Sequence, residues 1–265
     1  PKLSFRLFKP AVHTSAVVSV GGSSCLLLRT FAQPKKQGMT AAEQFSSGFA
    51  PIIGAPTVGK STFLNSLLNE KISIVTPKRQ TTRHRIRGII SGRQYQVVLS
   101  DTPGILEPQY LLQQRMMQFV NQAMEDADIF VYMVEANDVP EKHQAYLERL
   151  IPKGLPVMVV INKVDQTDQE ALAELVEAYQ AYVPAANVIP IAALRNFNVG
   201  SVMKRLTELL PEGPAYFPDD QVTDKSERFI VSEAIREQIL HKFKQEVPYS
   251  IEVNIEEFDE QENII

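Results

Sequence analysis

From residue 48 onwards, short apolar runs alternate with amphipathic stretches along the chain. This alternation is typical of folds in which strands and helices follow each other and the sheet is largely parallel. The runs expected to form strands are FAPIIG (49–54), RIRGIISG (85–92), YQVVLSD (95–101), IFVYMVE (129–135), LPVMVVIN (155–162) and NVIPIA (187–192). The expected helices span 60–69, 111–125, 140–150, 168–182 and 198–210. We therefore predict an α/β domain with helices on both faces of a mostly parallel sheet.

The pattern changes after residue 210. A proline and glycine cluster at 211–214 and a polar run up to residue 226 predict a linker over 212–226. Beyond it, ERFIVSEAIREQILHKF (227–243) has the apolar spacing of an amphipathic helix, and YSIEVNIEEF (249–258) alternates like a strand. The predicted organisation is a leader (1–47), a main domain (48–211), the linker, and a smaller C-terminal part (227–265).

Charge is distributed unevenly between the leader and the rest of the chain. Of 27 basic and 31 acidic side chains, six basic and no acidic ones fall within residues 1–42, which leaves 21 basic against 31 acidic side chains beyond them. The hydrophobic content of 44% is that of a globular protein and excludes a disordered chain, a collagen or a multi-span membrane protein. The single cysteine, Cys25, excludes an intramolecular disulfide and a multi-cysteine metal site.

The leader has three interpretations. Its uncharged stretch, 11–28, is too polar for a secretory signal or a membrane span. A basic, acid-free composition fits a transit peptide better, which would place the protein in the mitochondrial matrix. Alternatively, the protein starts at Met39 and is cytoplasmic, and residues 1–38 are then no targeting device. The leader is accordingly expected to be disordered or transit-like.

The sequence GAPTVGKS follows the first predicted strand and matches the phosphate-loop pattern GxxxxGKS/T. Glycines let backbone N–H groups approach a phosphate, and the following helix adds the partial positive charge of its N-terminus. In such loops the lysine, here Lys60, contacts the β- and γ-phosphates, and the hydroxyl, here Ser61, ligates Mg²⁺. The residues expected to contact a nucleotide are Gly54, Thr57, Val58, Gly59, Lys60, Ser61 and Thr62.

Two further motifs, DTPG and NKVD, lie where predicted strands end. The carboxylate of Asp101 suits the Mg²⁺ shell, and the N–H of Gly104 suits the γ-phosphate. Asn162 is expected to tie its loop to the phosphate loop, and the stem of Lys163 to cover the base. Asp165 can accept hydrogen bonds from the ring N–H and the exocyclic amine of guanine, a pair that adenine lacks, so an ATPase or kinase is disfavoured. Ligands of open α/β sheets bind at these strand ends.

Between the first two motifs lies KISIVTPKRQTTRHRIRG (71–88). We expect a switch segment here, with the hydroxyl of Thr82 joining Mg²⁺ when a γ-phosphate is present. The alternative is that Thr81, Thr82 and the basic run are the solvated start of an edge strand. The basic side chains and His84 within 78–87 also suit contact with RNA phosphate, and the sequence does not separate these roles.

The strings PKRQTTRHRIRG, DTPGI, NKVD and QVTDKSERF together resemble the Era family of Ras-like P-loop GTPases over about residues 48–258. The resemblance implies a GTP-hydrolysing switch that binds GTP or GDP with Mg²⁺. It also implies binding to small-subunit (16S-type) ribosomal RNA through a C-terminal type II KH domain of α+β fold, a role in assembling the pre-30S particle, and peripheral attachment at the inner membrane face. We expect a monomer.

Matching the motifs assigns roles to residues of this chain. The resemblance implies catalytic roles for Lys60, Thr82 and Gly104, and Mg²⁺ ligation by Ser61, Thr82 and Asp101. The remaining nucleotide contacts it implies, besides the phosphate loop, are Asp101, Gly104, Asn162, Lys163, Asp165, Ala192, Ala193 and Leu194. Of these, the N–H of Ala193 is expected to meet the guanine carbonyl oxygen.

The chain departs from the family pattern at several positions. Thr57 replaces an asparagine that helps hold potassium in related GTPases, so potassium activation is doubtful. Ala192 replaces a serine that supports guanine binding. Pro51 removes a hydrogen-bond donor from the first strand. Ile105 stands where many small GTPases place a water-orienting glutamine, so we expect slow intrinsic turnover.

The C-terminal part departs furthest. Residues 227–265 supply one helix and about one strand of a KH domain and contain no GXXG loop, so we expect a partial domain and weak RNA binding. An alternative function is therefore a nucleotide-responsive RNA-binding scaffold whose hydrolysis has decayed. His143 and His241 have no partner at metal-ligand spacing, and both are expected on helix surfaces.

The assignment of Asp165 can be tested by Asp165→Asn. We expect the affinity for GDP to fall by about 100-fold or more, because two charge-assisted hydrogen bonds are lost, and the preference to shift toward xanthosine diphosphate. Equilibrium binding of both nucleotides measures this, with Asp219→Asn in the predicted linker as the control. Unchanged guanine preference would contradict the assignment.

Overall fold

The structure is a computed structural model that describes residues 45–243 and 251–257. The chain divides into two units, residues 1–42 and 43–265, and every described residue belongs to the second. The first strand begins at Ser46, two residues before the expected start of the main domain. The rest of the predicted leader lies outside the described residues.

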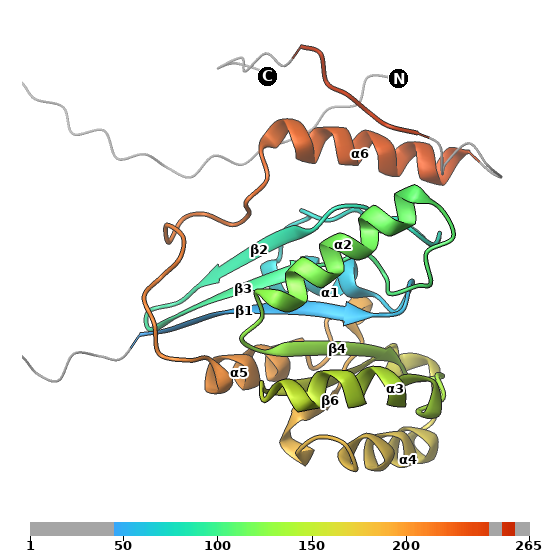
Figure 1. The fold of residues 1–265 in the computed structure, drawn as a ribbon, viewed down its shortest axis with the longest axis vertical. Coiled ribbons are helices and arrows are strands. Elements are labelled where there is room, and N and C mark those ends of the chain that lie inside the picture. Colours follow the sequence, from blue (N-terminus) through green and yellow to red (C-terminus); the bar gives the residue numbers. More distant parts are fainter. Residues whose placement is uncertain (1–44, 244–250, 258–265) are drawn as a thin grey trace, which may run out of the picture. The chain divides into compact units, whose positions relative to one another are not determined.

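A six-stranded sheet with the order β2-β3-β1-β4-β5-β6 forms the centre of the described unit (Figure 1). Only β2 runs antiparallel, to β3, and the other neighbouring pairs are parallel. The strands are β1 (Ser46–Gly54), β2 (Ile86–Ser91), β3 (Tyr95–Asp101), β4 (Phe130–Glu135), β5 (Val157–Asn162) and β6 (Val188–Pro190). The predicted α/β class and mostly parallel sheet are confirmed.

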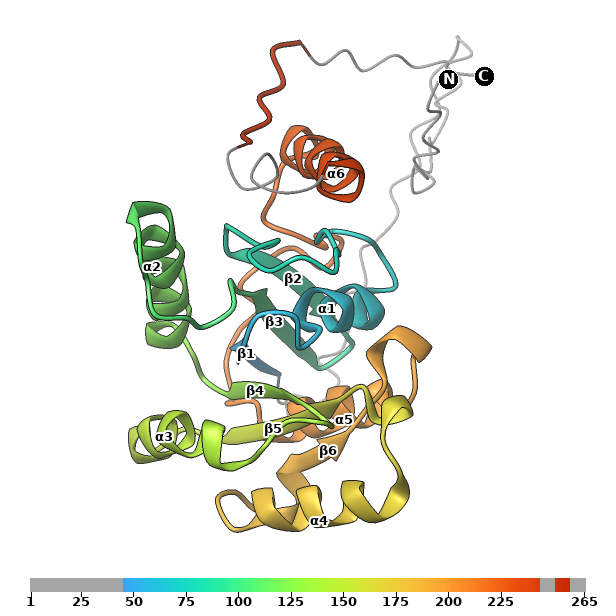
Figure 2. The ribbon, with the colours of Figure 1, turned by 90° about the vertical axis from the view of Figure 1, so that its right-hand side faces the viewer.

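Helices cover both faces of this sheet. The α-helices are α1 (Lys60–Leu68), α2 (Leu111–Glu125), α3 (Glu141–Leu150), α4 (Gln169–Gln180), α5 (Val199–Leu209) and α6 (Glu227–Lys242). Short 3-10 helices are η1 (Ile151–Lys153), η2 (Val164–Gln166), η3 (Ala185–Asn187) and η4 (Ala193–Arg195). Apolar side chains of α1 and α5 pack in one buried cluster with the sheet, and those of α3 and α4 pack in another. Figure 2 shows α2 and α3 on one side of the sheet and α1 and α5 on the other.

Three parallel strands bring the sequence motifs to one edge of the sheet. The phosphate loop follows β1, DTPG starts at the last residue of β3, and NKVD starts at the last residue of β5. Ile52 of β1 is paired with Asp101 of β3 in the parallel register. Because parallel strands end on the same side, the three motifs meet there.

Pro51 lies in a central strand without interrupting it. The N–H of Phe49 donates to Asp128 Oδ2 at 2.7 Å on the β4 side, and strand alternation points the Pro51 nitrogen to that side too. The β1–β4 ladder starts only at Ile52. Because the nitrogen of Pro51 faces β4, the N–H that proline lacks does not interrupt the hydrogen-bonded ladder between β1 and β3.

The predicted linker is a strap hydrogen-bonded to the sheet. Buried Gln96 of β3 holds it at one point: its Oε1 accepts from the N–H groups of Tyr216 and Phe217 at 2.8 and 2.9 Å, and its Nε2 donates to the Phe217 carbonyl at 2.8 Å. Further along, the N–H of Ile89 in β2 donates to the Val222 carbonyl at 2.8 Å. The strap thus covers the outer edge of β2, which would otherwise expose unpaired backbone groups.

The strap leads into α6, which Ser226 caps by accepting a hydrogen bond from the N–H of Phe229. The helix was predicted, but its buried stripe is polar: Glu233, Arg236 and Glu237 are buried beside Leu240. Residues 251–257 contain no strand, so that prediction was wrong for this segment, and the rest of 249–258 lies outside the described residues. An alternating sequence forms a strand only where a neighbouring strand pairs with it.

Among the described residues, no helix combines the length and apolar character that crossing a membrane requires.

The strap should contribute measurably to stability through Gln96. We expect Gln96→Ala to lower the free energy of unfolding by about 2 kcal/mol, because two backbone N–H groups and a carbonyl lose their partner. Denaturant unfolding measures this. The exposed neighbour Gln94→Ala is the control and should change stability by less than about 0.5 kcal/mol. Equal effects of the two substitutions would contradict the role of Gln96.

Candidate nucleotide-binding site

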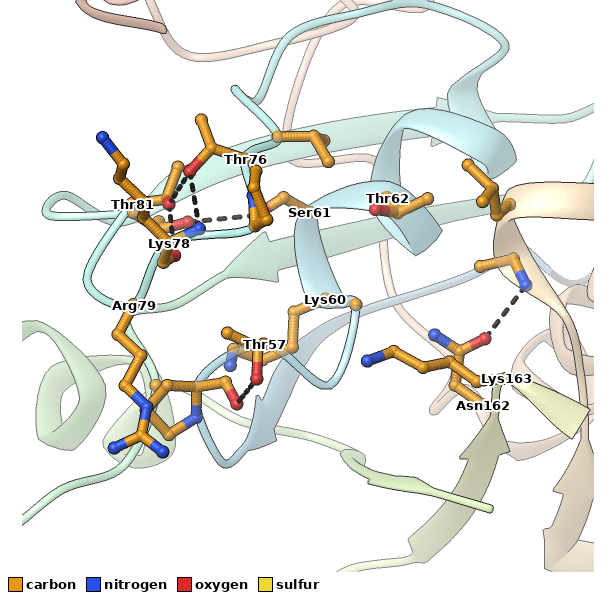
Figure 3. A pocket seen from close by; sticks show the side chains of 18 of the residues that line it. Thr57, Lys60, Ser61, Thr62, Thr76, Lys78, Arg79, Thr81, Asn162 and Lys163 are labelled. Atoms are coloured by element: carbon orange, nitrogen blue, oxygen red, sulfur yellow. Dashed lines mark hydrogen bonds between the residues drawn. The ribbon is translucent and has the colours of Figure 1, made fainter. Parts of the chain in front are cut away.

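The motifs surround a cavity of about 620 Å³ at the carboxyl edge of the sheet. Figure 3 shows the phosphate loop and the threonine-rich segment at one end and Asn162 and Lys163 at the other. Most of the predicted site residues line this cavity: Thr57, Gly59, Lys60, Ser61, Thr62, Thr82, Gly104, Asn162, Lys163, Asp165, Ala193 and Leu194. The predicted residues outside the lining are Gly54, Val58, Asp101 and Ala192.

Close backbone approach explains two glycines of the site. A Cβ on Gly59 would lie 2.3 Å from Asn162 Nδ2, and its φ of +100° is a conformation that other residues avoid. A Cβ on Gly104 would lie 2.5 Å from the backbone nitrogen of Pro56. The phosphate loop therefore touches both of the other motifs, which only glycine permits at these two positions.

Asn162 ties three loops together. Its Nδ2 donates to the Val58 carbonyl of the phosphate loop at 2.8 Å, and its Oδ1 accepts from the N–H of Ala193 at 3.0 Å. The predicted tie to the phosphate loop is confirmed. The N–H of Ala193, the expected donor to the guanine carbonyl oxygen, thus donates to Asn162.

Hydroxyl and carboxylate oxygens gather beneath the cavity. Ser61 Oγ lies 2.6 Å from Asp101 Oδ2 and 3.0 Å from Thr82 Oγ1, and Thr82 Oγ1 lies 3.3 Å from Asp101 Oδ2. Asp101 is fully buried, and its Oδ1 has no hydrogen-bond partner. Burial raises the pKa of Asp101, while the hydrogen bond from Ser61 and the charge of Lys60 oppose the rise. This all-oxygen set with an unpaired carboxylate oxygen fits Mg²⁺.

Lys60 is buried at the start of α1 with its amine turned to the phosphate loop. Its Nζ donates to the carbonyls of Ala55 and Gly54 at 2.8 and 3.1 Å. Burial lowers the pKa of Lys60 to about 8, and the charge of Asp101 limits the drop. A buried cation held by carbonyls alone is poised to bind an anion.

The segment that carries Thr82 is fixed from two directions. The side chain of Asn65 in α1 accepts from the N–H groups of Ile72 and Ser73 at 3.1 and 3.0 Å. From α6, Glu237 Oε1 accepts from the N–H of Val75 at 3.0 Å, and Arg236 Nη2 donates to the Thr81 carbonyl at 2.6 Å. No pattern in the sequence indicates these anchors, because only the fold brings α6 to this loop.

Comparison with known proteins agrees with the site. A family model described as 50S ribosome-binding GTPase matches residues 50–163. GTPase Era of Geotalea daltonii is 43% identical over 222 residues, covering 83% of this chain and 75% of that protein, and GTPase Era of Staphylococcus haemolyticus is 40% identical over 214 residues, covering 80% and 72%. The chain belongs to the Era family of GTPases.

Solved Era structures share the fold. Era in complex with MgGDPNP and nucleotides 1506–1542 of 16S ribosomal RNA has a TM-score of 0.73 and 35% identity, over 78% of this chain and 70% of that one. An Aquifex aeolicus Era variant bound to GDP and AlF4⁻ has the same TM-score and identity, over 78% and 71%. As an Era GTPase, this protein binds guanine nucleotides and hydrolyses GTP.

The end of the cavity where the guanine base is expected is partly exposed to solvent. The side chain of Asp165 is 33% exposed and lies 3.8 Å from Arg195 Nε, measured from Oδ2. Lys163 Nζ donates to Glu135 Oε1 at 2.6 Å, which fixes the stem of this lysine. Leu194 is 79% exposed at the cavity rim, where an incoming base could cover it.

The two departures in the Era loops have visible consequences. Thr57 has a φ of +69°, which a β-branched residue adopts with strain, and its hydroxyl donates to the Pro56 carbonyl at 2.6 Å. Ala192 offers no side-chain hydrogen bond, but its backbone pairs with Phe197. The loop after η4 therefore keeps its shape without a serine.

His143 is buried, so its predicted place on a helix surface was wrong. Its Nδ1 lies 2.8 Å from Tyr132 Oη, and its Nε2 lies 2.7 Å from Asp138 Oδ2. Helical spacing alone did not show that Tyr132 of β4 presents a polar atom beneath α3. His241 is exposed on α6, as expected.

Nucleotide binding should take up a proton at Lys60. A phosphate beside Nζ favours the charged amine, so binding raises the pKa of Lys60 from its value of about 8 in the free protein. At pH 8, GDP binding should take up about half a proton, and the affinity should fall as the pH rises further. Calorimetry in buffers with different ionisation enthalpies measures the uptake.

The matched control for this measurement is the same titration at pH 7, where Lys60 is already protonated and the uptake should be smaller. Binding enthalpies that are independent of the buffer at pH 8 would contradict the lowered pKa of this lysine.

Proposed function

We propose that this Era GTPase is a Mg²⁺-dependent switch that binds small-subunit (16S-type) ribosomal RNA and assists assembly of the small ribosomal subunit on the pre-30S particle. Its relatives support the RNA partner, because an Era protein has been solved with MgGDPNP and nucleotides 1506–1542 of 16S ribosomal RNA. Ser61, Thr82 and Asp101 are the proposed Mg²⁺ ligands, and their oxygens already converge.

One observation carries the switch: α6 is hydrogen-bonded to the backbone of the loop that carries Thr82. Loss of the γ-phosphate would release Thr82 from this arrangement and change the backbone positions that Arg236 and Glu237 recognise. These two side chains are buried and also paired with Lys71 and Glu233, so shifting the loop backbone would cost α6 its hydrogen bonds to Val75 and Thr81 while the ion pairs remain. The nucleotide state therefore biases the position of the C-terminal segment, where we place the RNA contact and the start of a KH domain.

The competing function is an RNA-binding scaffold with decayed hydrolysis. Thr57 and Ala192 favour it, because each removes a polar group from the site. Turnover separates the two functions: the switch hydrolyses GTP slowly but measurably, and the scaffold binds GTP without releasing phosphate. We also propose that potassium does not accelerate hydrolysis, because Thr57 offers a single hydroxyl where related GTPases have an asparagine amide. Equal turnover in potassium and sodium is the expected result.

The remaining parts of the proposal concern where the protein acts. We propose a cytoplasmic monomer that attaches peripherally to the inner membrane face when its partners require it. Size measurement by light scattering and sedimentation with lipid vesicles test these two points separately.

The switch predicts that RNA affinity depends on the nucleotide. RNA carrying the 3′ end of 16S ribosomal RNA should bind more tightly in the presence of GDPNP than of GDP. Glu237→Ala should reduce the difference by about tenfold, because α6 loses its hydrogen bond from Val75 and its ion pair with Lys71. Filter binding at fixed salt measures both affinities.

Glu227→Ala is the matched control, since this exposed glutamate lies in the first turn of the same helix. It should preserve the nucleotide dependence. Equal RNA affinity with GDP and GDPNP in the unsubstituted protein would contradict the switch, and equal binding of an unrelated RNA would contradict the ribosomal partner.

A further inference from the structure

The basic residues between 78 and 87 differ in what they contact. Arg85 and Arg87 form ion pairs with Asp126, and Arg87 also pairs with Asp224. Lys78 donates to the Phe243 carbonyl at the end of α6. These three side chains therefore hold the fold together.

Arg79 is different, because it is exposed and lines the nucleotide cavity. Within the described part of the chain, no carboxylate lies within ion-pair distance of its guanidinium and no hydrogen bond occupies it. Figure 3 shows its side chain reaching toward the end of the cavity that contains Thr57, away from Asn162 and Lys163. A free cation thus faces the phosphate end of the site.

The loop presents Arg79 from a defined turn. Thr76 Oγ1 and Thr81 Oγ1 lie 2.6 Å apart, Thr81 Oγ1 donates to the Lys78 carbonyl at 2.8 Å, and the N–H of Lys78 donates to Thr76 Oγ1 at 3.2 Å. Gln80, the next residue, has a φ of +59° and accepts a hydrogen bond from Tyr110 Oη at 2.7 Å. The backbone on both sides of Arg79 is therefore fixed while its side chain is free.

The other charged groups of the site indicate how Arg79 would act during hydrolysis. The amine of Lys60 is hydrogen-bonded to a phosphate-loop carbonyl, and Ser61 and Asp101 would hold Mg²⁺ at the start of α1 and the end of β3. Arg79 comes from a different segment, the loop before β2, and lines the same cavity as Pro56, Thr57 and Gly104. During hydrolysis, charge spreads over the equatorial oxygens of the γ-phosphoryl group and the leaving oxygen, and a guanidinium that reaches them stabilises it.

We propose that Arg79 is a catalytic residue of GTP hydrolysis, an arginine that the chain supplies to its own active site from the Thr76–Thr81 turn. In the step, the water oxygen bonds to the γ-phosphorus while the bond from that phosphorus to the β–γ bridging oxygen breaks. The bridging electrons stay on GDP, and the water proton passes to a phosphate oxygen. Arg79 keeps its protons and contributes only charge and hydrogen bonds.

This inference rests on the GTPase activity of the family and not on the proposed RNA role, so the two fail separately. The test compares single-turnover hydrolysis and equilibrium binding of GDP, GDPNP and GDP with aluminium fluoride for the full chain and for Arg79→Ala. Loss of Arg79 should slow hydrolysis at least tenfold, keep GDP affinity within about twofold, and weaken binding of the aluminium fluoride complex selectively.

Two further variants complete the test. Arg79→Lys should retain an intermediate rate, because a point charge replaces a planar fork. Arg93→Ala, an exposed arginine in the turn between β2 and β3, removes the same charge elsewhere and should hydrolyse GTP at the normal rate. An unchanged rate in Arg79→Ala would overturn the proposal, as would an equal loss of GDP and aluminium fluoride binding.

Discussion

The site depends on one buried amide. Asn162 links the phosphate loop to the guanine-side loop because its two polar atoms bond Val58 and Ala193, and the close contact at Gly59 leaves no room for anything else. Three segments that are far apart in the sequence are thereby held at fixed spacing. A nucleotide that spans them meets a preformed surface, so less of its binding energy is used to order the protein.

On the other side of the cavity, the loop that carries Thr82 and Arg79 is held by charged side chains. These side chains come from α6 and form hydrogen bonds to the backbone of the loop. These hydrogen bonds join a charged side chain to a single backbone group, and hydrogen bonds weaken steeply with distance and angle, so the contacts are sensitive to small displacements. In the proposed switch, the segments joined by Asn162 orient the nucleotide, and the loop held by α6 is the part that responds to which nucleotide is present.

The sequence predicted the sheet, its helices and the three motifs closely, because each depends on local periodicity or on a fixed spacing of residue types. It did not predict the buried face of α6. The apolar positions suggested one face, but Ile235 and Phe243 of that face are exposed while Glu233 and Glu237 are buried. The roles of Gln96 and His143 were not predicted for the same reason. Their hydrogen-bond partners come from other elements, and the residues next to them in the sequence do not indicate those partners. The motif residues thus supply the groups that contact the nucleotide, while contacts formed only in the fold position the segments that carry them.

The strap gives the C-terminal helix a short tether. Thr223 and Asp224 are bonded to Arg87 of β2, and α6 begins at Glu227, so a single residue, Lys225, separates the last anchor from the Ser226 cap. A helix attached this closely can leave the loop only by turning about that point, and it remains at high effective concentration while it is away. Return is then a unimolecular event, whose rate is independent of how much protein the cell contains.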